Sequence, residues 1–368
     1  MKSLSLFSLL TCILFFCACQ EQPAKVVHVS KKRIVHQRHT IVTPPDSTIS
    51  IAAVGDMMLG SSYPNVNNLP PDSAKNSFKA ARQYLREADI AFGNLEGTLL
   101  DSGVPEGKKK FKPYLFRMPV TYGKVFKDAG FDLLSIANNH IDDFGALGRK
   151  STGIVLDSCG IQYAGLQVKP VTIFTVKGVK FGFCAFAPNS YVVSLHDYKN
   201  ACRIIGNLKQ QVDIVIVSFH GGGEGVGFEH VLCQKESFMG ENRGDVHEFA
   251  HNAIDAGADV VFGNGPHVSR AMELYNNHLI AYSLGNFCTY KSVSVSGVCG
   301  MAPLLQVRLD KKGKFLNGKI IAFKQDHWKG LQRDTLNRVV SRIKYLTETD
   351  FPQSGLTIND DGVIGVAQ

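Results

Sequence analysis

Residues 214–224 read IVIVSFHGGGE, an apolar run of strand length that ends in a histidine, three glycines and a glutamate. A strand that is apolar at every position is buried on both faces, which is typical of parallel sheets covered by helices. Similar runs recur at 49–54, 90–92, 133–137, 181–186, 260–262 and 279–284. Helix-like stretches separate many of them, at 74–87, 120–129, 146–158, 200–211 and 245–256. The sequence therefore predicts an α/β fold.

Two regions break this alternation. Near residues 271–275 and over 304–323, apolar strand-like runs follow one another directly, which predicts an antiparallel part and hence mixed sheets. Residues 331–346 predict one further helix, followed by a tail that contains Gly and Asp. We divide this part of the chain into a main domain at 49–325 and a C-terminal helix and tail at 326–368.

Six predicted strands end in residues that commonly bind metals or transfer protons. They are followed by Asp56; Asn94 and Glu96; Asn138, Asn139 and His140; His220 and Glu224; Asn264 and His267; and Asn286. Taken singly, such endings are typical of turns and helix caps. Ligand sites in open α/β sheets, however, gather beyond the carboxyl ends of the strands. Carboxylate oxygens, an Asn carbonyl and imidazole nitrogens together suit Mn²⁺, Fe²⁺ or Zn²⁺, so the six endings predict one divalent-metal site.

These segments resemble, in the same order, the CapA-type capsule and poly-γ-glutamate biosynthesis family, which is similar to the calcineurin-like metallophosphoesterases. The resemblance rests on GD at 55–56, GNLEG at 93–97, ANNH at 137–140, HGGGE at 220–224, GNGPH at 263–267 and YSLGNF at 282–287. It covers residues 50–324 and implies a four-layer αββα sandwich with one or two divalent ions (Mn, Fe or Zn).

The resemblance also implies roles for single residues. The metal ligands would be Asp56, Glu96, Asn139, His220 and His267. His140 would act as general acid, and Glu224 would orient His220. The side-chain amides expected to bind substrate are Asn94, Asn138, Asn264 and Asn286. The ions would activate a water for attack on a phosphoester or amide bond.

The chain departs from the metallophosphoesterase pattern at two places. Met57 and Met58 follow Asp56 where Asp-x-His is usual, and Asn264 stands where many CapA-type proteins carry His. Two imidazoles of the fuller set are therefore absent. This leaves open a second hypothesis, in which the chain keeps the fold and binds or assembles a polymer without catalysing a reaction.

A competing motif lies within the predicted helix at 245–256. Residues 247–251 read HEFAH, which matches the H-E-x-x-H signature of zinc proteases. His247 and His251 would share one helix face beside the apolar stripe, and Glu273 is the carboxylate that could complete a ligand set. The position of the helix before a strand favours packing on a sheet instead.

The N-terminus predicts export. Lys2 precedes an apolar run at 4–16 that is short for a membrane span, and Ala18-Cys19 resembles the end of a lipoprotein signal, with Cys19 as the lipidated residue. The alternative is ordinary signal-peptide cleavage nearby. Residues 20–48 are basic and contain Pro, so we expect a flexible tether. The predicted location is the cell envelope, facing the periplasm or the cell surface.

The expected partners follow from this location and from the charge. The net charge of +8 includes a cluster of lysines at 108–112, which suits an anionic polymer or its precursor. An exported protein is not expected to bind nucleic acid, whereas the membrane, through the lipid, and other capsule-synthesis proteins are expected partners. The sequence as a whole predicts an envelope-anchored, metal-dependent hydrolase or transferase in capsule or poly-γ-glutamate-like polymer biosynthesis.

Overall fold

The fold is described from a computed structural model over residues 48–105 and 114–367. The predicted signal, Cys19, almost all of the tether and the lysines at 108–112 lie outside these residues. No helix in the described ranges is long and apolar enough to cross a membrane.

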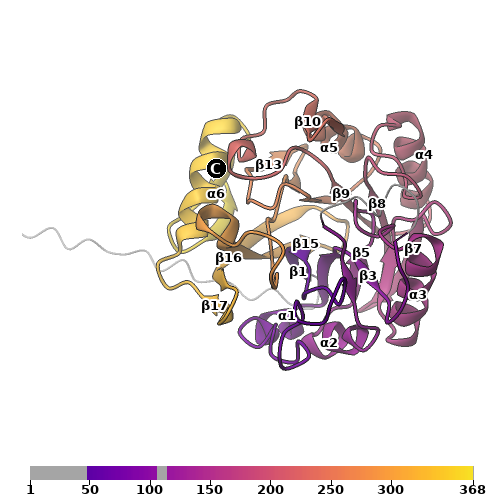
Figure 1. Ribbon diagram of the computed structural model, residues 1–368. Coiled ribbons are helices and arrows are strands. Elements are labelled where there is room, and N and C mark those ends of the chain that lie inside the picture. The colour runs from indigo at the N-terminus through magenta and orange to yellow at the C-terminus, as the bar shows by residue number, and fades with distance from the viewer. Residues whose placement is uncertain (1–47, 106–113, 368) are drawn as a thin grey trace, which may run out of the picture. The chain divides into compact units, whose positions relative to one another are not determined.

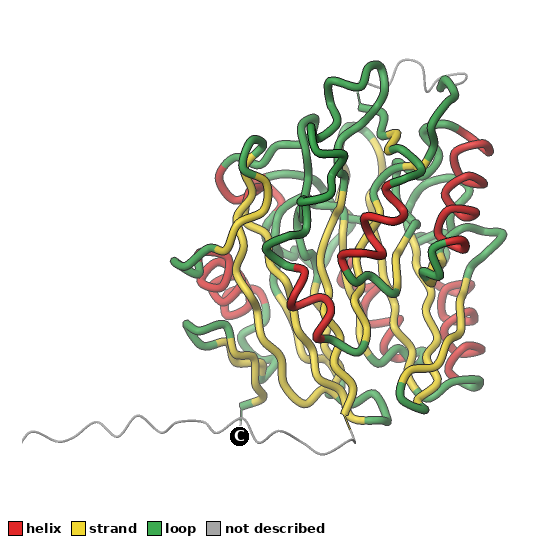
Figure 2. Tube along the Cα trace, turned by 90° about the horizontal axis from the view of Figure 1, so that it is seen from below, coloured by secondary structure: helices red, strands yellow, loops and turns green. Residues whose placement is uncertain are grey.

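Two mixed sheets form the centre of the fold (Figures 1 and 2). The nine-stranded sheet has the order β18 (Leu356–Ile358), β19 (Val363–Val366), β16 (Phe315–Asp326), β15 (Met301–Asp310), β1 (Thr48–Met57), β2 (Ile90–Leu95), β5 (Leu133–Ser135) and β6 (Gln162–Ala164), with β17 (Gly330–Arg333) paired to β16. The six-stranded sheet has the order β13 (Met272–Tyr275), β14 (His278–Ala281), β12 (Val260–Asn264), β9 (Ile214–His220), β8 (Val179–Phe186) and β7 (Val171–Val176).

Parallel pairing holds the middle of each sheet, as the apolar runs predict. Strands β1, β2, β5 and β6 are mutually parallel, and so are β8, β9, β12 and β14. The antiparallel pairs β13–β14 and β15–β16 fall where strands follow one another directly. Two small sheets complete the set, β3 (Thr98–Leu99) with β4 (Arg117–Met118) and β10 (Glu236–Phe238) with β11 (Glu241–Gly244).

Helices cover the outer faces of the two sheets, which gives the predicted αββα layers (Figures 1 and 2). On the side of the nine-stranded sheet lie α1 (Arg82–Glu87), α2 (Tyr122–Ala129) and α3 (Gly145–Ser158); on the side of the six-stranded sheet lie α4 (Tyr198–Lys209) and α5 (Val246–Asp255). The last helix, α6 (Arg338–Asp350), contacts β15 and β16 of one sheet and β13 of the other. Two short 3₁₀ turns are η2 (Val226–Phe228) and η3 (Gly297–Gly300).

Alternating side chains divide the core into layers. In β9, Ile214 and Ile216 belong to the cluster between the sheets, whereas Val215 and Val217 pack under the helices. Phe92 stacks on Phe262 across the two sheets, with ring centroids 5.1 Å apart. Because full burial of a Phe contributes about 1.5–3 kcal/mol, contacts of this kind hold the sheets face to face.

The chain beyond residue 326 continues the nine-stranded sheet. Strands β17 and β19 both pair with β16, along the edge that β15 leaves free. The helix expected at 331–346 is observed at Arg338–Asp350, because Leu331 pairs in β17 instead. The tail therefore adds three strands and one helix to the same body.

Candidate metal centre

The carboxyl ends of both sets of parallel strands meet at Asp56. Its backbone N–H donates to Gly285 O at 2.8 Å, and Asp56 forms an isolated bridge with Asn286 from the other sheet. Glycine is required here, since a Cβ on Gly55 would lie 1.9 Å from Gly285 O. The strand-end residues predicted from the sequence are thus brought to one place from two sheets.

The Asp56 side chain is fixed by donors from both sides. Its Oδ1 accepts a hydrogen bond from Asn94 Nδ2 at 2.8 Å, and its Oδ2 accepts one from the Gly265 backbone N–H at 3.0 Å. Asn94 is the penultimate residue of β2 in the nine-stranded sheet, and Gly265 follows β12 of the other. The carboxylate is fully buried and oriented before any ion arrives.

Glu96 is the unusual group of the centre. It is fully buried, and neither carboxylate oxygen has a hydrogen-bond partner. Around its Oε1 lie three imidazole Nε2 atoms, those of His140 at 4.0 Å, His220 at 4.0 Å and His267 at 3.6 Å. An unpartnered buried carboxylate costs free energy, so this arrangement is suited to a cation between the oxygen and the rings.

The two histidines predicted as ligands occupy different local structures. His220 ends β9; its Nδ1 lies 3.3 Å from Asn94 Nδ2, and its Nε2 is buried without a partner. His267 lies in the loop after β12 at φ +58°, a left-handed conformation that is uncommon outside glycine. Its Nδ1 lies 2.9 Å from Asn286 Oδ1 and 3.4 Å from Asp56 Oδ2. Both rings direct Nε2 toward Glu96.

His140 is held from behind by Asp143. The His140 Nδ1 lies 2.8 Å from Asp143 Oδ2, which also accepts the Phe116 backbone N–H at 2.8 Å. The imidazole packs on the Phe116 ring with centroids 4.1 Å apart. A carboxylate at Nδ1 keeps the proton on that nitrogen and leaves Nε2 for the centre. The sequence places Asp143 three residues after His140 but assigns it no role, and Phe116 has no motif signal.

The asparagines divide into two kinds. Asn138 Nδ2 donates to Asn94 Oδ1 at 3.2 Å, and Asn286 Nδ2 donates to three backbone carbonyls including that of His267, so both hold other parts of the centre in place. Asn139 and Asn264 each have a buried side-chain oxygen with no hydrogen-bond partner. These two amide oxygens are the ones available to an ion or a substrate.

Glu224 points to a different histidine from the one expected. Its Oε1 pairs with the Arg243 guanidinium, and its Oε2 lies 3.9 Å from His267 Nε2; among the described residues, no hydrogen bond or ion pair joins it to His220. Arg243 is buried on β11 and also donates to Gly222 O at 3.4 Å. It comes from a short hairpin without apolar periodicity, which is why the sequence shows no signal for it.

The three glycines after His220 allow charged side chains to approach the backbone. A Cβ on Gly222, at φ +84°, would lie 2.8 Å from Arg270 Nη1, and one on Gly223 would lie 2.2 Å from the Phe228 ring. Arg270 is fully buried and pairs with Glu236 at 2.6 Å, while Glu236 accepts the Gly223 N–H at 2.8 Å. The loop is therefore packed against a buried ion pair.

The ionisable side chains of the centre shift one another's pKa values. Burial raises the pKa of Glu96 to about 7, against the lowering effect of His267. Burial also lowers the pKa of His220 to about 3, so this ring is neutral. For His267, burial is outweighed by Glu96 and Asp56, which raise its pKa to about 10. The pKa of Asp56 is lowered: burial would raise it, but the hydrogen bond to His267 and the nearby His220 outweigh that effect.

The donor set fits a divalent cation. Asp56, Glu96 and His267 offer ligand atoms within 4.8 Å of one another, and Glu96, His220 and Asn139 carry buried atoms without partners. The proton on His267 supplies positive charge that the two carboxylates require, and a cation can take its place. Mixed carboxylate and imidazole ligands suit Mn²⁺, Fe²⁺ or Zn²⁺.

The residues at the two departures from the metallophosphoesterase pattern each make a hydrogen bond inside the protein. Met58 is fully buried, and its sulfur accepts the Gly60 N–H at 3.2 Å. Asn264 Nδ2 donates to Ser218 Oγ at 3.1 Å.

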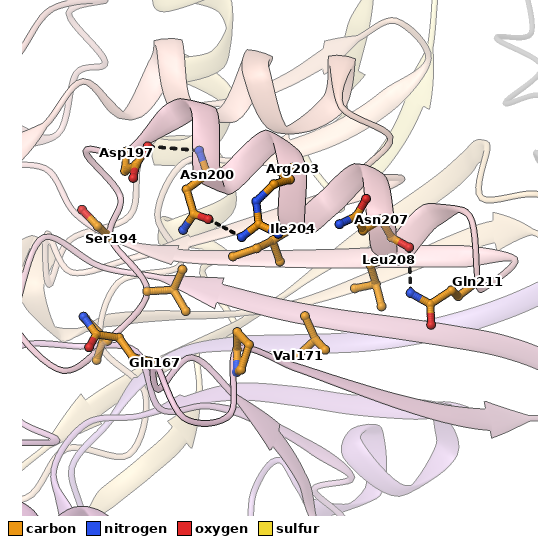
Figure 3. Close-up of a pocket in the computed structure, with 13 residues that line it drawn as sticks. Gln167, Val171, Ser194, Asp197, Asn200, Arg203, Ile204, Asn207, Leu208 and Gln211 are labelled. Carbon is orange, nitrogen blue, oxygen red and sulfur yellow. Dashed lines mark hydrogen bonds between the residues drawn. The ribbon is translucent and has the colours of Figure 1, made fainter.

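A cavity of about 500 Å³ lies elsewhere, between α4 and β7 (Figure 3). Its polar lining combines neutral amides with one guanidinium, one carboxylate and one hydroxyl: Gln167, Asn200, Asn207, Gln211, Arg203, Asp197 and Ser194. Within the lining, Arg203 Nη2 donates to Asn200 Oδ1 at 2.6 Å (Figure 3). The cavity shares no residue with the metal centre.

The family model described as bacterial capsule synthesis protein PGA_cap matches residues 50–291. The chain belongs to this family. The match contains every strand-end residue of the centre from Asp56 to Asn286. The resemblance read from the six motifs is thus confirmed.

Two relatives of the chain are named for capsule or PGA biosynthesis. The capsule biosynthesis protein CapA of Bacillus anthracis is 27% identical over 275 residues, which cover 68% of this chain and 63% of the relative. The PGA biosynthesis protein CapA of Bacillus subtilis is 28% identical over 264 residues, covering 67% and 65%. The chain thus spans just under two thirds of the length of these relatives.

Among solved structures, the 5'-nucleotidase precursor of Thermus thermophilus is 14% identical, with a TM-score of 0.41, covering 75% of this chain and 54% of that one.

Proposed function

We propose that this member of the capsule synthesis family is a metal-dependent hydrolase or transferase that acts on a phosphoester or amide bond of an anionic envelope polymer or its precursor. One observation carries the proposal: Glu96 is buried without a hydrogen-bond partner, and three imidazole Nε2 atoms lie within 4.0 Å of its Oε1. A site that served only to stabilise the fold would satisfy this carboxylate with protein donors.

The residues that would hold the cation are Asp56, Glu96, Asn139, His220 and His267. When bound, a divalent ion polarises the bond under attack and lowers the pKa of water. Asp56 is already oriented by two donated hydrogen bonds. Asn286 fixes the His267 ring through Nδ1. Such supporting contacts keep ligands in place and are costly to remove.

His140 supplies the proton that the leaving group needs. Its Nδ1 is occupied by Asp143 and its ring lies against Phe116, so the Nε2 atom is the one that exchanges protons at the centre. Glu224, joined to Arg243, lies beside His267 and adjusts the charge on that ring.

The polymer and the location are inferred from the relatives and from the N-terminus. The relatives are named for capsule and PGA biosynthesis. An anionic polymer fits the basic net charge of +8. Lipidation at Cys19 would place the chain at the envelope membrane, where other capsule-synthesis proteins would meet it.

The test combines metal analysis with turnover. The purified chain, loaded with Mn²⁺ or Zn²⁺ and then dialysed, is compared with Asp56→Ala and with Glu348→Gln, which changes an exposed acid on α6. We expect Asp56→Ala to bind less metal than wild type and to lose turnover in a screen of phosphoesters and γ-glutamyl amides, and Glu348→Gln to match wild type in both. Equal metal content in wild type and Asp56→Ala would refute the proposed centre.

A second candidate function is polymer binding or assembly without turnover. It is favoured by Asn264, which stands where the motif resemblance leads us to expect a His and whose side chain donates to Ser218 Oγ. In that case the ion would be retained, and a labelled poly-γ-glutamate would bind wild type but not Asp56→Ala, while every substrate in the screen stayed intact. A comparison of wild type with Asp56→Ala therefore distinguishes catalysis from polymer binding without turnover.

The peptidase alternative has a structural difficulty. In an H-E-x-x-H protease the glutamate is the general base beside the metal. Here Glu248 is exposed and lines a separate cavity with His196 and Tyr198. A casein digestion assay with Zn²⁺-loaded chain is expected to show no cleavage.

A further inference from the structure

A second group of potential metal ligands lies on α5 and β13. His247 and His251 are one helical turn apart, with ring centroids separated by 4.0 Å. One ligand atom from each ring and one oxygen of Glu273 lie within 4.8 Å of one another. His251 Nε2 already contacts Glu273 Oε2 at 2.9 Å. The group shares no residue with the Glu96 centre.

Aromatic rings hold this group in position. His251 stacks on Tyr275 with centroids 3.8 Å apart, and His247 lies parallel to the Phe351 ring, at 5.9 Å and 7°. Tyr282 donates its hydroxyl to Glu273 Oε2 at 2.7 Å. The rotamers are thus restricted before any ligand binds, and Glu273 is oriented from behind, as ligands in metal sites commonly are.

Ordinary packing explains only part of this arrangement. The contact between His251 and Glu273 needs a single imidazole. Within the described residues no hydrogen bond to the His247 ring is present, although the ring packs beside His251. Two adjacent imidazoles cannot both be protonated without repulsion. A divalent cation would use the lone pair of each ring and the carboxylate together.

We propose that His247, His251 and Glu273 form a second divalent-metal site, of the zinc class, that joins α5 to β13. Two nitrogens and one carboxylate oxygen form a common zinc ligand set, with water at the remaining position. The His251 side chain is 22% exposed and that of Glu273 11%, so an ion can enter from solvent.

The position of the site indicates a structural role. Phe351 follows α6 and stacks on both His247 and Tyr282, so α5, the residue after β14 and the end of α6 meet here. Helix α5 also begins two residues after Gly244, at the end of the hairpin that carries Arg243. A metal at this junction would fasten the helix that follows the Arg243–Glu224 pair. It would not catalyse proteolysis, because Glu248 lies on another surface.

The experiment uses the full chain without a polyhistidine tag and removes the two sites separately. Zinc content after dialysis is measured in wild type, Asp56→Ala, the double variant His247→Ala/His251→Ala, and the triple combination. We expect the double variant to lose about one zinc per chain, the Asp56→Ala chain to keep that zinc, and the triple variant to keep none. His196→Ala, an exposed histidine outside the group, should match wild type.

Two further measurements distinguish loss of the metal ligands from misfolding of the variants. Glu273→Gln keeps the size of the side chain and should weaken zinc binding in the Asp56→Ala background, while circular dichroism stays unchanged. Zinc should raise the Tm of Asp56→Ala but not that of the triple variant. The proposal is overturned if folded Asp56→Ala binds the same amount of zinc with and without His247 and His251. Metal content in Asp56→Ala equal to wild type, with zinc lost from the double variant, would count against the proposed centre and not against this site.

Discussion

The Glu96 centre and the group formed by His247, His251 and Glu273, here called the α5 cluster, contain similar potential ligands. Their carboxylates differ in hydrogen bonding. At the centre, Glu96 is fully buried and neither of its oxygens has a hydrogen-bond partner. In the α5 cluster, Glu273 accepts a hydrogen bond from Tyr282 and is in contact with His251. The first carboxylate needs a cation to offset its burial, whereas the second is satisfied without one. We therefore expect an ion at the centre to serve the function, and an ion at the cluster to add stability to a folded protein.

The two groups also differ in which parts of the chain their side chains come from. The centre draws its side chains from strand ends in two sheets, so its geometry depends on the whole fold. The cluster takes two residues from one helical turn and a third from β13. Variants at the centre should consequently change chemistry strongly, and variants at the cluster should change stability alone.

The largest expected effect comes from Glu96→Gln. Removing outer partners of metal ligands costs 10–100-fold in affinity, so loss of a ligand should cost more than about 100-fold and abolish measurable turnover. The metal-free protein should become more stable, by about 1–3 kcal/mol at pH 8. Because burial raises the pKa of Glu96 from its ordinary value to about 7, the unfolded chain ionises more readily, and the resulting loss of stability grows between these two pH values and is full above pH 7.

The sign of this change in stability is measured by chemical denaturation of the metal-free proteins. The gain from Glu96→Gln should be full above pH 7 and disappear below the ordinary carboxyl pKa, where Glu96 is protonated in both folded and unfolded chains. Glu273→Gln provides the comparison and should not stabilise, since its carboxylate already has partners. Equal gains from the two variants would show that the contrast between the sites is mistaken.

The next effect is expected at His140. His140→Ala should lower kcat by about 10²–10⁴-fold with little change in KM, because proton transfer is lost while the proposed metal ligands remain. Asp143→Asn should lower kcat by about 10–100-fold, since Asp143 holds the ring. Steady-state kinetics with metal-loaded protein measure both values, and His196→Ala serves as the control. A KM effect without a kcat effect would assign His140 to substrate binding instead.

Much of the fold was predictable because parallel strands are buried on both faces. The apolar runs at 214–219 and 260–262 correspond to β9 and β12, and their ends bring His220 beside Asn264 in register. Helix α1 is shorter than predicted: it begins at Arg82, and residues 73 and 74 adopt positive φ values of 56° and 62°. Residues with positive φ cannot continue an α-helix, and the sequence gives no obvious signal for them here.

The site was predictable to the same extent as the strands. Asp56, Glu96 and His220 follow apolar runs, so sheet geometry alone brings them together. Arg243 lies on a four-residue strand, and Asp143 acts through a turn after β5. Neither position has a periodic pattern, because its role arises from tertiary contact. The strands β18 and β19 were missed for a similar reason, since three or four residues among Gly and Asp carry too little pattern.

A smaller effect is expected from Asn264→His. The substitution restores an imidazole beside the unpartnered oxygens of the centre and should raise metal affinity by about tenfold, as judged by competition with a chelator. Asn317→His, at an exposed position of β16, is the control and should leave affinity unchanged. If the folded Asn264→His chain binds metal no better than wild type, position 264 does not face the ion.

The smallest effect, and the one that compares the two sites within one protein, is the pH dependence of metal uptake. At the centre, neighbouring carboxylates raise the pKa of His267 to about 10 against the effect of burial, and burial raises that of Glu96 to about 7. An incoming cation must displace these protons, so its affinity should rise between pH 6 and 8. In the α5 cluster, burial and then the neighbouring His251 hold the pKa of His247 below its usual value, so a cation competes with fewer protons there.

Calorimetric titration of zinc at pH 6, 7 and 8 measures this difference, with Asp56→Ala to isolate the cluster and His247→Ala/His251→Ala to isolate the centre. The affinity of the centre should increase more steeply with pH than that of the cluster, and proton release per zinc should be larger at the centre. Equal slopes would mean that the centre does not hold its protons through buried carboxylates, and the functional contrast between the two sites would then rest on geometry alone.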